Sequence, residues 1–345
     1  MNSKADPTLR WQSVFDRIDA TMHADPEAAL SLCKQVFVES YLWEPPIYVR
    51  AAERYGQIMD HLGKSVEARD SLFAAQEAAQ GSCLPIYEAK ILERLARSYY
   101  SAGDYTRALQ YWNSCIEVSN RTEGDAGTWI LAKVGLAQVY KGSGNYAVSQ
   151  AMLAEAQARS VDVGDPHLDA KVKINLAVIL LEQGQADAAS LVLHETFRIC
   201  SDNLLYDYLA ESNLYLGKIA MSDGALDRAL AYLDAGLQAA GKVNFRWAEA
   251  HILAVQAEVY ARCADFEMAM QAVRQAQAIA AADGFSDLLI QQHFAAAEYA
   301  AQMNDFATAY AEHKAGRACE QRVAAERLEN DYRDGQLRTD SPDVS

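Results

Sequence analysis

The chain has 345 residues, a formal net charge of −16, and 51% hydrophobic against 23% charged residues. This composition supports a large buried core, and the negative charge argues against a nucleic-acid-binding protein. No apolar run is long enough to span a membrane, and residues 1–7 lack the apolar core of a signal peptide. We therefore expect a cytoplasmic protein with no membrane partner.

Helical patterns follow one another along the chain. A helix over about 8–23 and a second after Asp25-Pro26 predict an N-terminal capping hairpin, residues 1–45. Pro45-Pro46 precedes a repeat array over 46–320, and residues 321–345 are expected to extend the last helix to about 338 and to end in a polar tail. Helix pairs within the array are expected at about 47–62 with 65–80, 128–142 with 146–160 and 166–182 with 186–200, and hairpins over 204–241, 244–282 and 285–320.

A short turn recurs in this array at a spacing of 40 or 41 residues. Its turn residues are Gly63, Gly103, Gly144, Gly184, Gly224, Ala264 and Asn304. A small residue stands seven positions before each turn residue and another five positions after it, as Ala96 and Ala108 do around Gly103. Small residues on both sides of a tight turn allow two antiparallel helices to approach closely, so each unit is predicted to be a helical hairpin.

The segment Gly103-Asp104-Tyr105, followed by Ala108, resembles the second half of a tetratricopeptide repeat. The other copies match this signature in part, and the longer period is similar to that of long-helix variants, including kinesin light chains, bacterial peptide-receptor regulators and the sensory regions of some diguanylate cyclases. HEAT repeats share the length but do not need this turn signature. The resemblance implies an all-α, right-handed superhelical solenoid of about eight antiparallel hairpins.

Motifs of catalysis are missing from the sequence. It has no phosphate-binding glycine loop, no HExxH, no GxSxG and no paired-cysteine zinc pattern, and its seven histidines fall in different repeats. The six cysteines are scattered and are interpreted as structural filler. We therefore expect a protein that is not an enzyme and that needs no cofactor or metal.

The resemblance also implies a binding surface, because the first helix of each hairpin lines the concave face of such solenoids. Positions 13, 10, 9, 6 and 3 residues before the turn are expected to be exposed there. They begin polar and cationic and become apolar in the fourth hairpin, where Leu131, Val134 and Gly135 fall on this face. The candidate binding residues are Arg50, Arg54, Lys90, Arg94, Arg97, Gln138, Lys141, Lys171, Asn175 and Lys218.

Arginine offers a planar fork that fits carboxylates, and Asn175 could hold a ligand backbone with its amide. These residues predict a partner protein or extended peptide with an acidic group. The alternative is that Glu53 and Glu93 neutralise the arginines in ordinary surface pairs worth about 0–1 kcal/mol.

Two further functions stay open at this point. The charged segment from His313 to Arg338 is similar to the helix that connects sensory regions to the catalytic domain in some diguanylate cyclases, although no GGDEF-type catalytic segment is present. The chain would then be a regulatory input module. A purely structural assembly scaffold is the other alternative.

Overall fold

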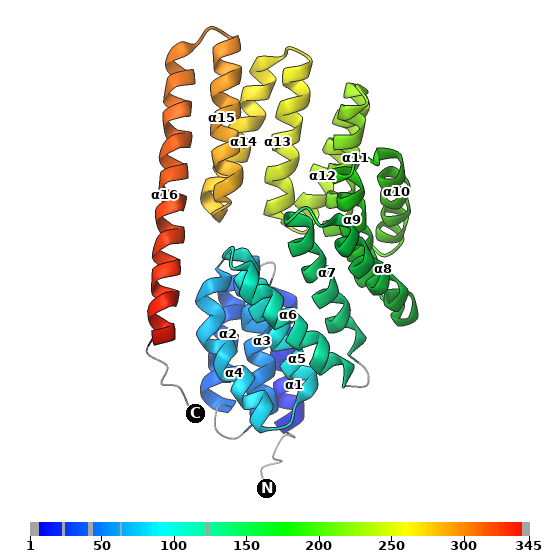
Figure 1. Cartoon of the computed structure of the whole chain (residues 1–345), viewed down its shortest axis with the longest axis vertical. Coiled ribbons are helices and arrows are strands. Elements are labelled where there is room, and N and C mark those ends of the chain that lie inside the picture. Colours follow the sequence, from blue (N-terminus) through cyan, green and yellow to red (C-terminus); the bar gives the residue numbers. More distant parts are fainter. Residues whose placement is uncertain (1–6, 23–24, 41–43, 63, 122–124, 340–345) are drawn as a thin grey trace. The chain divides into compact units, whose positions relative to one another are not determined.

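The computed structural model describes residues 7–22, 25–40, 44–62, 64–121 and 125–339, without the side chains of residues 7–10, 61, 65 and 326–339. The expected turn at Gly63 and the end of the polar tail, 340–345, lie outside the described residues. The described chain is helical throughout, and its elements (Figure 1) are α1 Pro7–Thr21, α2 Pro26–Ser40, α3 Pro45–His61, the 3-10 helix η1 Ser65–Ala68, α4 Arg69–Gly81, α5 Pro85–Ser101, α6 Tyr105–Asn120, α7 Ala126–Gly142, α8 Tyr146–Val163, α9 Pro166–Glu182, α10 Ala186–Asp202, α11 Tyr206–Ser222, α12 Leu226–Lys242, α13 Arg246–Arg262, α14 Phe266–Asp283, α15 Ser286–Gln302 and α16 Phe306–Thr339.

Consecutive helices pack as hairpins from α1 with α2 to α9 with α10, and again in α13 with α14 and α15 with α16, and most of these hairpins also pack against the first helix of the next. In α11 and α12, a Cβ on Gly217 would lie 2.8 Å from the side chain of Leu233. The predicted all-α array of about eight hairpins is confirmed over the described residues. Predicted and observed helix ends differ by a few residues at most, and the helix expected over 166–182 is observed at Pro166–Glu182.

The turn signature closes one helix and starts the next. Gly103 adopts the left-handed conformation with φ of 82°. Its N–H donates to the carbonyl of Tyr100 at 3.0 Å, and the N–H of Asp104 donates to that of Tyr99 at 2.9 Å, which satisfies the last carbonyls of α5 in a Schellman motif. The Asp104 carboxylate then accepts the N–H of Arg107 at 3.0 Å and caps α6.

The small residues beside the turns are buried where the two helices meet. Ala96 and Ala108 are fully buried, and so is Ser149, whose hydroxyl donates to the carbonyl of Ala137 at 2.6 Å. At Gly56 an added Cβ would lie 3.0 Å from the side chain of Leu72. Small side chains are therefore required by the helix separation, as the repeat pattern predicts.

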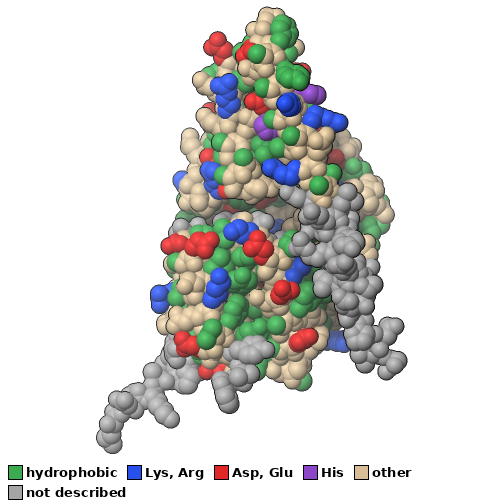
Figure 2. All heavy atoms as spheres, turned by 90° about the vertical axis from the view of Figure 1, so that its left-hand side faces the viewer, with side chains coloured by type: hydrophobic (Ala, Val, Ile, Leu, Met, Phe, Trp, Pro, Cys, Tyr) green, Lys and Arg blue, Asp and Glu red, His purple; other side chains and the backbone are tan. Residues whose placement is uncertain are grey.

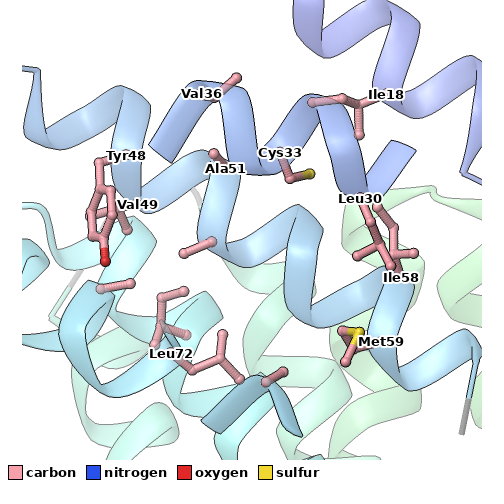
Figure 3. Packing of buried hydrophobic residues seen from close by; sticks show 14 of the residues in the cluster. Ile18, Leu30, Cys33, Val36, Tyr48, Val49, Ala51, Ile58, Met59 and Leu72 are labelled. Carbon is pink, nitrogen blue, oxygen red and sulfur yellow. The ribbon is translucent and has the colours of Figure 1, made fainter. Parts of the chain in front are cut away.

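Each hairpin buries its apolar residues against its neighbours. Figure 3 shows this at the start of the array, where Ile18, Cys33 and Ile58 from α1, α2 and α3 meet with no exposed surface. The next hairpins continue this packing with Trp112, whose ring lies so near α7 that a Cβ on Gly135 would come within 2.2 Å of it. Gly135 and Val134 are thus buried, which corrects the expectation that they are exposed on the concave face.

Contacts between Cα atoms divide the chain into two compact units, residues 1–212 and 213–345, with the boundary inside α11. The division predicted from the sequence, 1–45, 46–320 and 321–345, remains a prediction. The final helix continues as expected beyond the repeat: α16 has 34 residues, whereas α15 has 17. Among the described residues, no helix combines the length and apolar character needed to cross a bilayer.

Candidate partner-binding site

The candidate residues lie on the first helix of successive hairpins, at the positions 13, 10, 9, 6 and 3 residues before each turn, which we call inner positions. In the first unit, charged inner residues of α3 and α5 gather in what we call the charge cluster. Its members are Glu53, Arg54, Asp60, Glu93, Arg94 and Arg97.

Arg94 is at the centre of the charge cluster. Its Nη2 lies 3.2 Å from Oε1 of Glu53, and its Nη1 lies 3.6 Å from Oδ2 of Asp60 and 3.8 Å from Oε2 of Glu93. The Arg94 side chain is 15% exposed and that of Glu93 is 3% exposed. The pairs with Glu53 and Asp60 join α5 to α3, the pair with Glu93 lies within α5, and all three are largely shielded from solvent.

The other two arginines extend the charge cluster in both directions. Arg54 donates to Glu53 and, through Nε, to Oδ1 of Asp19 on α1 at 2.6 Å. Arg97 donates to Glu93, while its Nε–H is buried without a hydrogen-bond acceptor among the described residues. That Nε lies 4.0 Å from Oδ2 of Asp60, which is also left without a donor.

Burial and the neighbouring charges set the ionisation of the three acids. Burial acts to raise the pKa of Glu53 and Glu93, but the guanidinium groups of Arg94 with Arg54, and of Arg97 with Arg94, hold each pKa below its ordinary value. At Asp60 burial prevails and raises the pKa to about 6, although Arg94 and Arg97 oppose it. The arginines therefore favour the ionised forms of Glu53 and Glu93, whereas burial favours the protonated form of Asp60.

Arg54, Arg94 and Arg97 therefore pair with Glu53 and Glu93, as in the alternative that these acids neutralise the arginines, with one difference. Their partners are acidic residues of the same fold, but the pairs are buried, so removing one member leaves an uncompensated charge. Their role in binding a partner remains a prediction.

Most of the remaining candidates also have contacts within the fold. Arg50 donates to Gln12 at 3.2 Å and lies 4.0 Å over the ring of Phe15. Gln138 donates to Asn175 at 3.0 Å, and Asn175 donates to the carbonyl of Lys171 at 2.8 Å, so α7 and α9 are joined by this amide pair. Cation–π contacts place Lys90 5.9 Å from the Tyr87 ring and Lys218 5.4 Å from the Tyr215 ring.

Two lysines differ from the other candidates. Within the described part of the chain, neither Lys141 nor Lys171 forms an ion pair or a side-chain hydrogen bond. Burial and the nearby charge of Arg97 lower the pKa of Lys171, while Glu211 opposes that shift. Burial in turn raises the pKa of Glu211 to about 7 despite Lys171. Lys141, Lys171 and Glu211 all lie within the first unit.

The second unit contains a cavity of about 630 Å³ between α13, α14 and α15. Six of its eleven lining residues occupy inner positions: Ala254, Glu258, Ala261, Gln291, Ala295 and Glu298. None of these residues is among the candidates predicted from the sequence, which end with Lys218 on the sixth hairpin. Counting back from Ala264 and Asn304 in the same register identifies them.

The lining of the cavity combines apolar, amide and charged groups. Phe266 and Tyr299 provide aromatic surface, with ring centroids 6.4 Å apart. Gln292 is only 6% exposed, and its Oε1 is buried with no hydrogen-bond donor among the described residues. An unpaired buried amide typically costs about 1–3 kcal/mol, so this residue lowers stability unless a ligand satisfies it.

Among the described residues, the histidines, cysteines and acidic residues are dispersed over several helices. They include no group of three or more His, Cys, Asp or Glu side chains placed to hold a metal ion. His293 contacts Glu312 at 2.7 Å, and His313 packs on Phe294 at 5.4 Å between ring centroids. Burial raises the pKa of the Cys33 thiol to about 12, as expected for a structural cysteine, whereas Cys83 and Cys263 are exposed and so are not core filler.

On the face drawn in Figure 2, acidic and basic side chains alternate, with hydrophobic side chains between them. Because both charge signs occur among the side chains coloured there, the cavity and the inner positions are the more specific features.

No protein-family model and no curated protein matches the sequence. Similar solved structures include a Rap protein complexed with competence and sporulation factor, with a TM-score of 0.71 and 14% identity over 95% of this chain and 90% of that chain. Another is aspartyl phosphate phosphatase F from Bacillus subtilis, with a TM-score of 0.63 and 13% identity; the match covers 93% of this chain and 85% of that chain. A third is a signal transduction ATPase with numerous domains and a tetratricopeptide repeat sensor, from Pyrococcus horikoshii. Its TM-score is 0.57 with 14% identity, and the match covers 94% of this chain and 52% of that chain.

These similarities place the chain in a structural class, the helical-repeat fold of tetratricopeptide-repeat proteins, as the turn signature predicts. At such low identity they establish the fold alone. The similarity of the final helix to diguanylate cyclase connectors stays a prediction.

Proposed function

We propose that this chain is a non-catalytic helical-repeat module that binds a partner protein or peptide along the inner positions of its hairpins. The observation that carries the proposal is the cavity of about 630 Å³ between α13 and α15, which combines aromatic surface with unpaired polar groups. Volumes of roughly 300–1,000 Å³ with a few convergent polar groups are usual for ligand sites. The Rap structure complexed with competence and sporulation factor has the same fold and agrees with this proposal.

The acidic group predicted for the partner would bind to cationic side chains of the first unit. Lys141 and Lys171 support it, because these cationic side chains form no ion pair or side-chain hydrogen bond among the described residues, whereas Arg97 already pairs with Glu93. The internal ion pairs of Arg54 and Arg94 count against those two residues as free anchors.

Site-specific photocrosslinking tests the proposal. A photoreactive phenylalanine analogue replaces Ala295 in the cavity, and the matched control carries it at Ala278, an exposed alanine on α14 outside the lining. We expect a discrete crosslinked polypeptide from a lysate of the source organism with the first variant only. Equal crosslinking from both positions, with both proteins folded by circular dichroism, would contradict binding at the inner positions.

A regulatory role through α16 is the second candidate, and the length of this helix favours it. Only about half of its 34 residues can lie beside the 17-residue α15. Deletion of residues 326–345 is expected to leave the melting temperature and the Ala295 crosslink unchanged while abolishing any control of an output protein. A large loss of stability would instead assign this segment to the fold.

A further inference from the structure

The α13–α15 cavity contains a polar group that the fold leaves unused. Gln292 lines the cavity, is more than nine-tenths buried, and its Oε1 has no donor within the described residues. A primary amide presents one acceptor and one donor side by side, the same pair that a peptide unit presents. Because buried polar groups are nearly always paired in native proteins, the unpaired Oε1 of Gln292 suits a ligand that donates a hydrogen bond, such as a main-chain N–H.

The charges of the cavity favour a cationic ligand. Arg262 pairs with Glu258 at 2.8 Å and also donates to the carbonyl of Met221 at 3.2 Å, so its guanidinium is already engaged. Glu298 has no hydrogen bond or ion pair to any described residue. The lining therefore contains two carboxylates against one guanidinium, and one carboxylate is uncompensated.

The surroundings of Tyr299 place both carboxylates near one aromatic ring. Burial raises the pKa of the Tyr299 hydroxyl, and the charges of Glu258 and Glu298 raise it further, while Arg262 opposes them. An aromatic face beside carboxylates suits a lysine or arginine side chain, whose methylene stem packs on apolar surface while its charged end meets the acid. Ala254, Ala261 and Ala295 leave room for such a stem.

From these features we propose that the cavity binds an extended peptide segment carrying a lysine or arginine side chain, with Gln292 pairing to a peptide unit and Glu298 to the cation. This proposal rests on the proposed function and specifies the partner for the second unit. It differs from the acidic group predicted for the first unit, since the two units present different charges at their inner positions.

A selection experiment on the full chain tests the proposal. Random dodecapeptides displayed on phage are selected against the immobilised wild-type protein, and the most enriched sequence is synthesised with a fluorescein label for anisotropy titrations. We expect enrichment of Lys or Arg, and at least tenfold weaker binding when that residue of the peptide is replaced by Glu.

Two variants locate the contacts. Gln292→Leu is expected to weaken binding at least tenfold while the melting temperature stays the same or rises, because it removes the unpaired amide. Glu298→Gln, an exposed change, is expected to weaken binding to a similar extent and to reduce its salt dependence. Glu267→Gln removes an exposed carboxylate of α14 outside the cavity and should leave binding unchanged.

The outcomes separate this proposal from the proposed function. Peptides that bind equally to wild type, Gln292→Leu and Glu298→Gln would overturn the cavity proposal and leave binding at other inner positions standing. Selected peptides that require Gln292 but are acidic, or are indifferent to charge, would overturn only the cationic specificity. Failure to select any peptide, together with no crosslink from Ala295, would overturn both.

Discussion

At the scale of single residues, two repeat turns place a side chain where the backbone favours glycine. Ala264 and Asn304 have φ values of 58° and 61°, close to the values of the turn glycines. Asparagine tolerates this left-handed region better than alanine does, because its side chain can hydrogen-bond locally. Ala264 is therefore the more strained of the two turn residues.

Replacement of Ala264 by glycine is expected to raise the free energy of unfolding by about 1 kcal/mol, because the left-handed conformation costs alanine more than glycine. Ala264 is exposed, so no packing is lost. Urea denaturation measures the change. Gly224→Ala, at the same turn position with φ of 74°, serves as the reverse control and should lower stability by a similar amount; a stabilising Gly224→Ala would contradict the explanation.

At the scale of elements, the charge cluster joins α3 to α5. Arg94→Met leaves Glu53, Asp60 and Glu93 buried with less compensation, and we expect a loss of about 3 kcal/mol. Glu53→Gln in the same chain should restore part of this loss, which a double-mutant cycle from chemical denaturation would measure. Arg228→Met breaks an exposed pair and should change stability by less than about 0.5 kcal/mol.

The raised pKa of Asp60 makes this junction pH-dependent. The folded state holds the Asp60 proton up to about pH 6, whereas the ordinary value is 3.8. Between these values the native state binds more protons than the unfolded state, so this group makes stability fall as the pH rises from about 4 to about 6.

Asp60→Asn removes that effect. Relative to that of wild type, its free energy of unfolding should increase by about 1–3 kcal/mol as the pH rises from 4 to 7, because only wild type loses stability in this range. Urea titrations at both pH values measure the difference, with Asp70→Asn, an exposed carboxylate on α4, as the control. A difference between variant and wild type that does not change with pH would mean that Asp60 is ionised throughout this range.

At the scale of the whole molecule, a repeat array is stabilised by contacts between neighbouring hairpins, so damage is expected to stay local. Gly135→Ala would push a methyl group into the Trp112 ring and should destabilise α5 to α8 by about 1–3 kcal/mol. Hydrogen exchange should rise in that region and stay unchanged in α13 to α15. Gly142→Ala, where no atom lies within 4 Å, is the control, and loss of protection in both units would indicate one cooperative unit.

The class of fold and most helix ends can be predicted from the amino-acid pattern alone. Gly103 and Asp104 act locally: one supplies the left-handed conformation, and the other caps the next helix, so their positions alone indicate where hairpins turn. The buried small residues Ala96 and Ala108 follow from the same spacing. Local backbone requirements of this kind can be read from one chain without knowledge of its contacts.

Which inner residues are buried or already paired depends on contacts between helices. The periodicity places Arg94 and Gly135 on the inner face, but it does not show that three acids surround the first or that Trp112 covers the second. Likewise, the buried and unpaired amide of Gln292 depends on how α13, α14 and α15 pack. Burial and pairing arise between helices that are distant in sequence, and the repeat pattern specifies the direction of a side chain but not its neighbours.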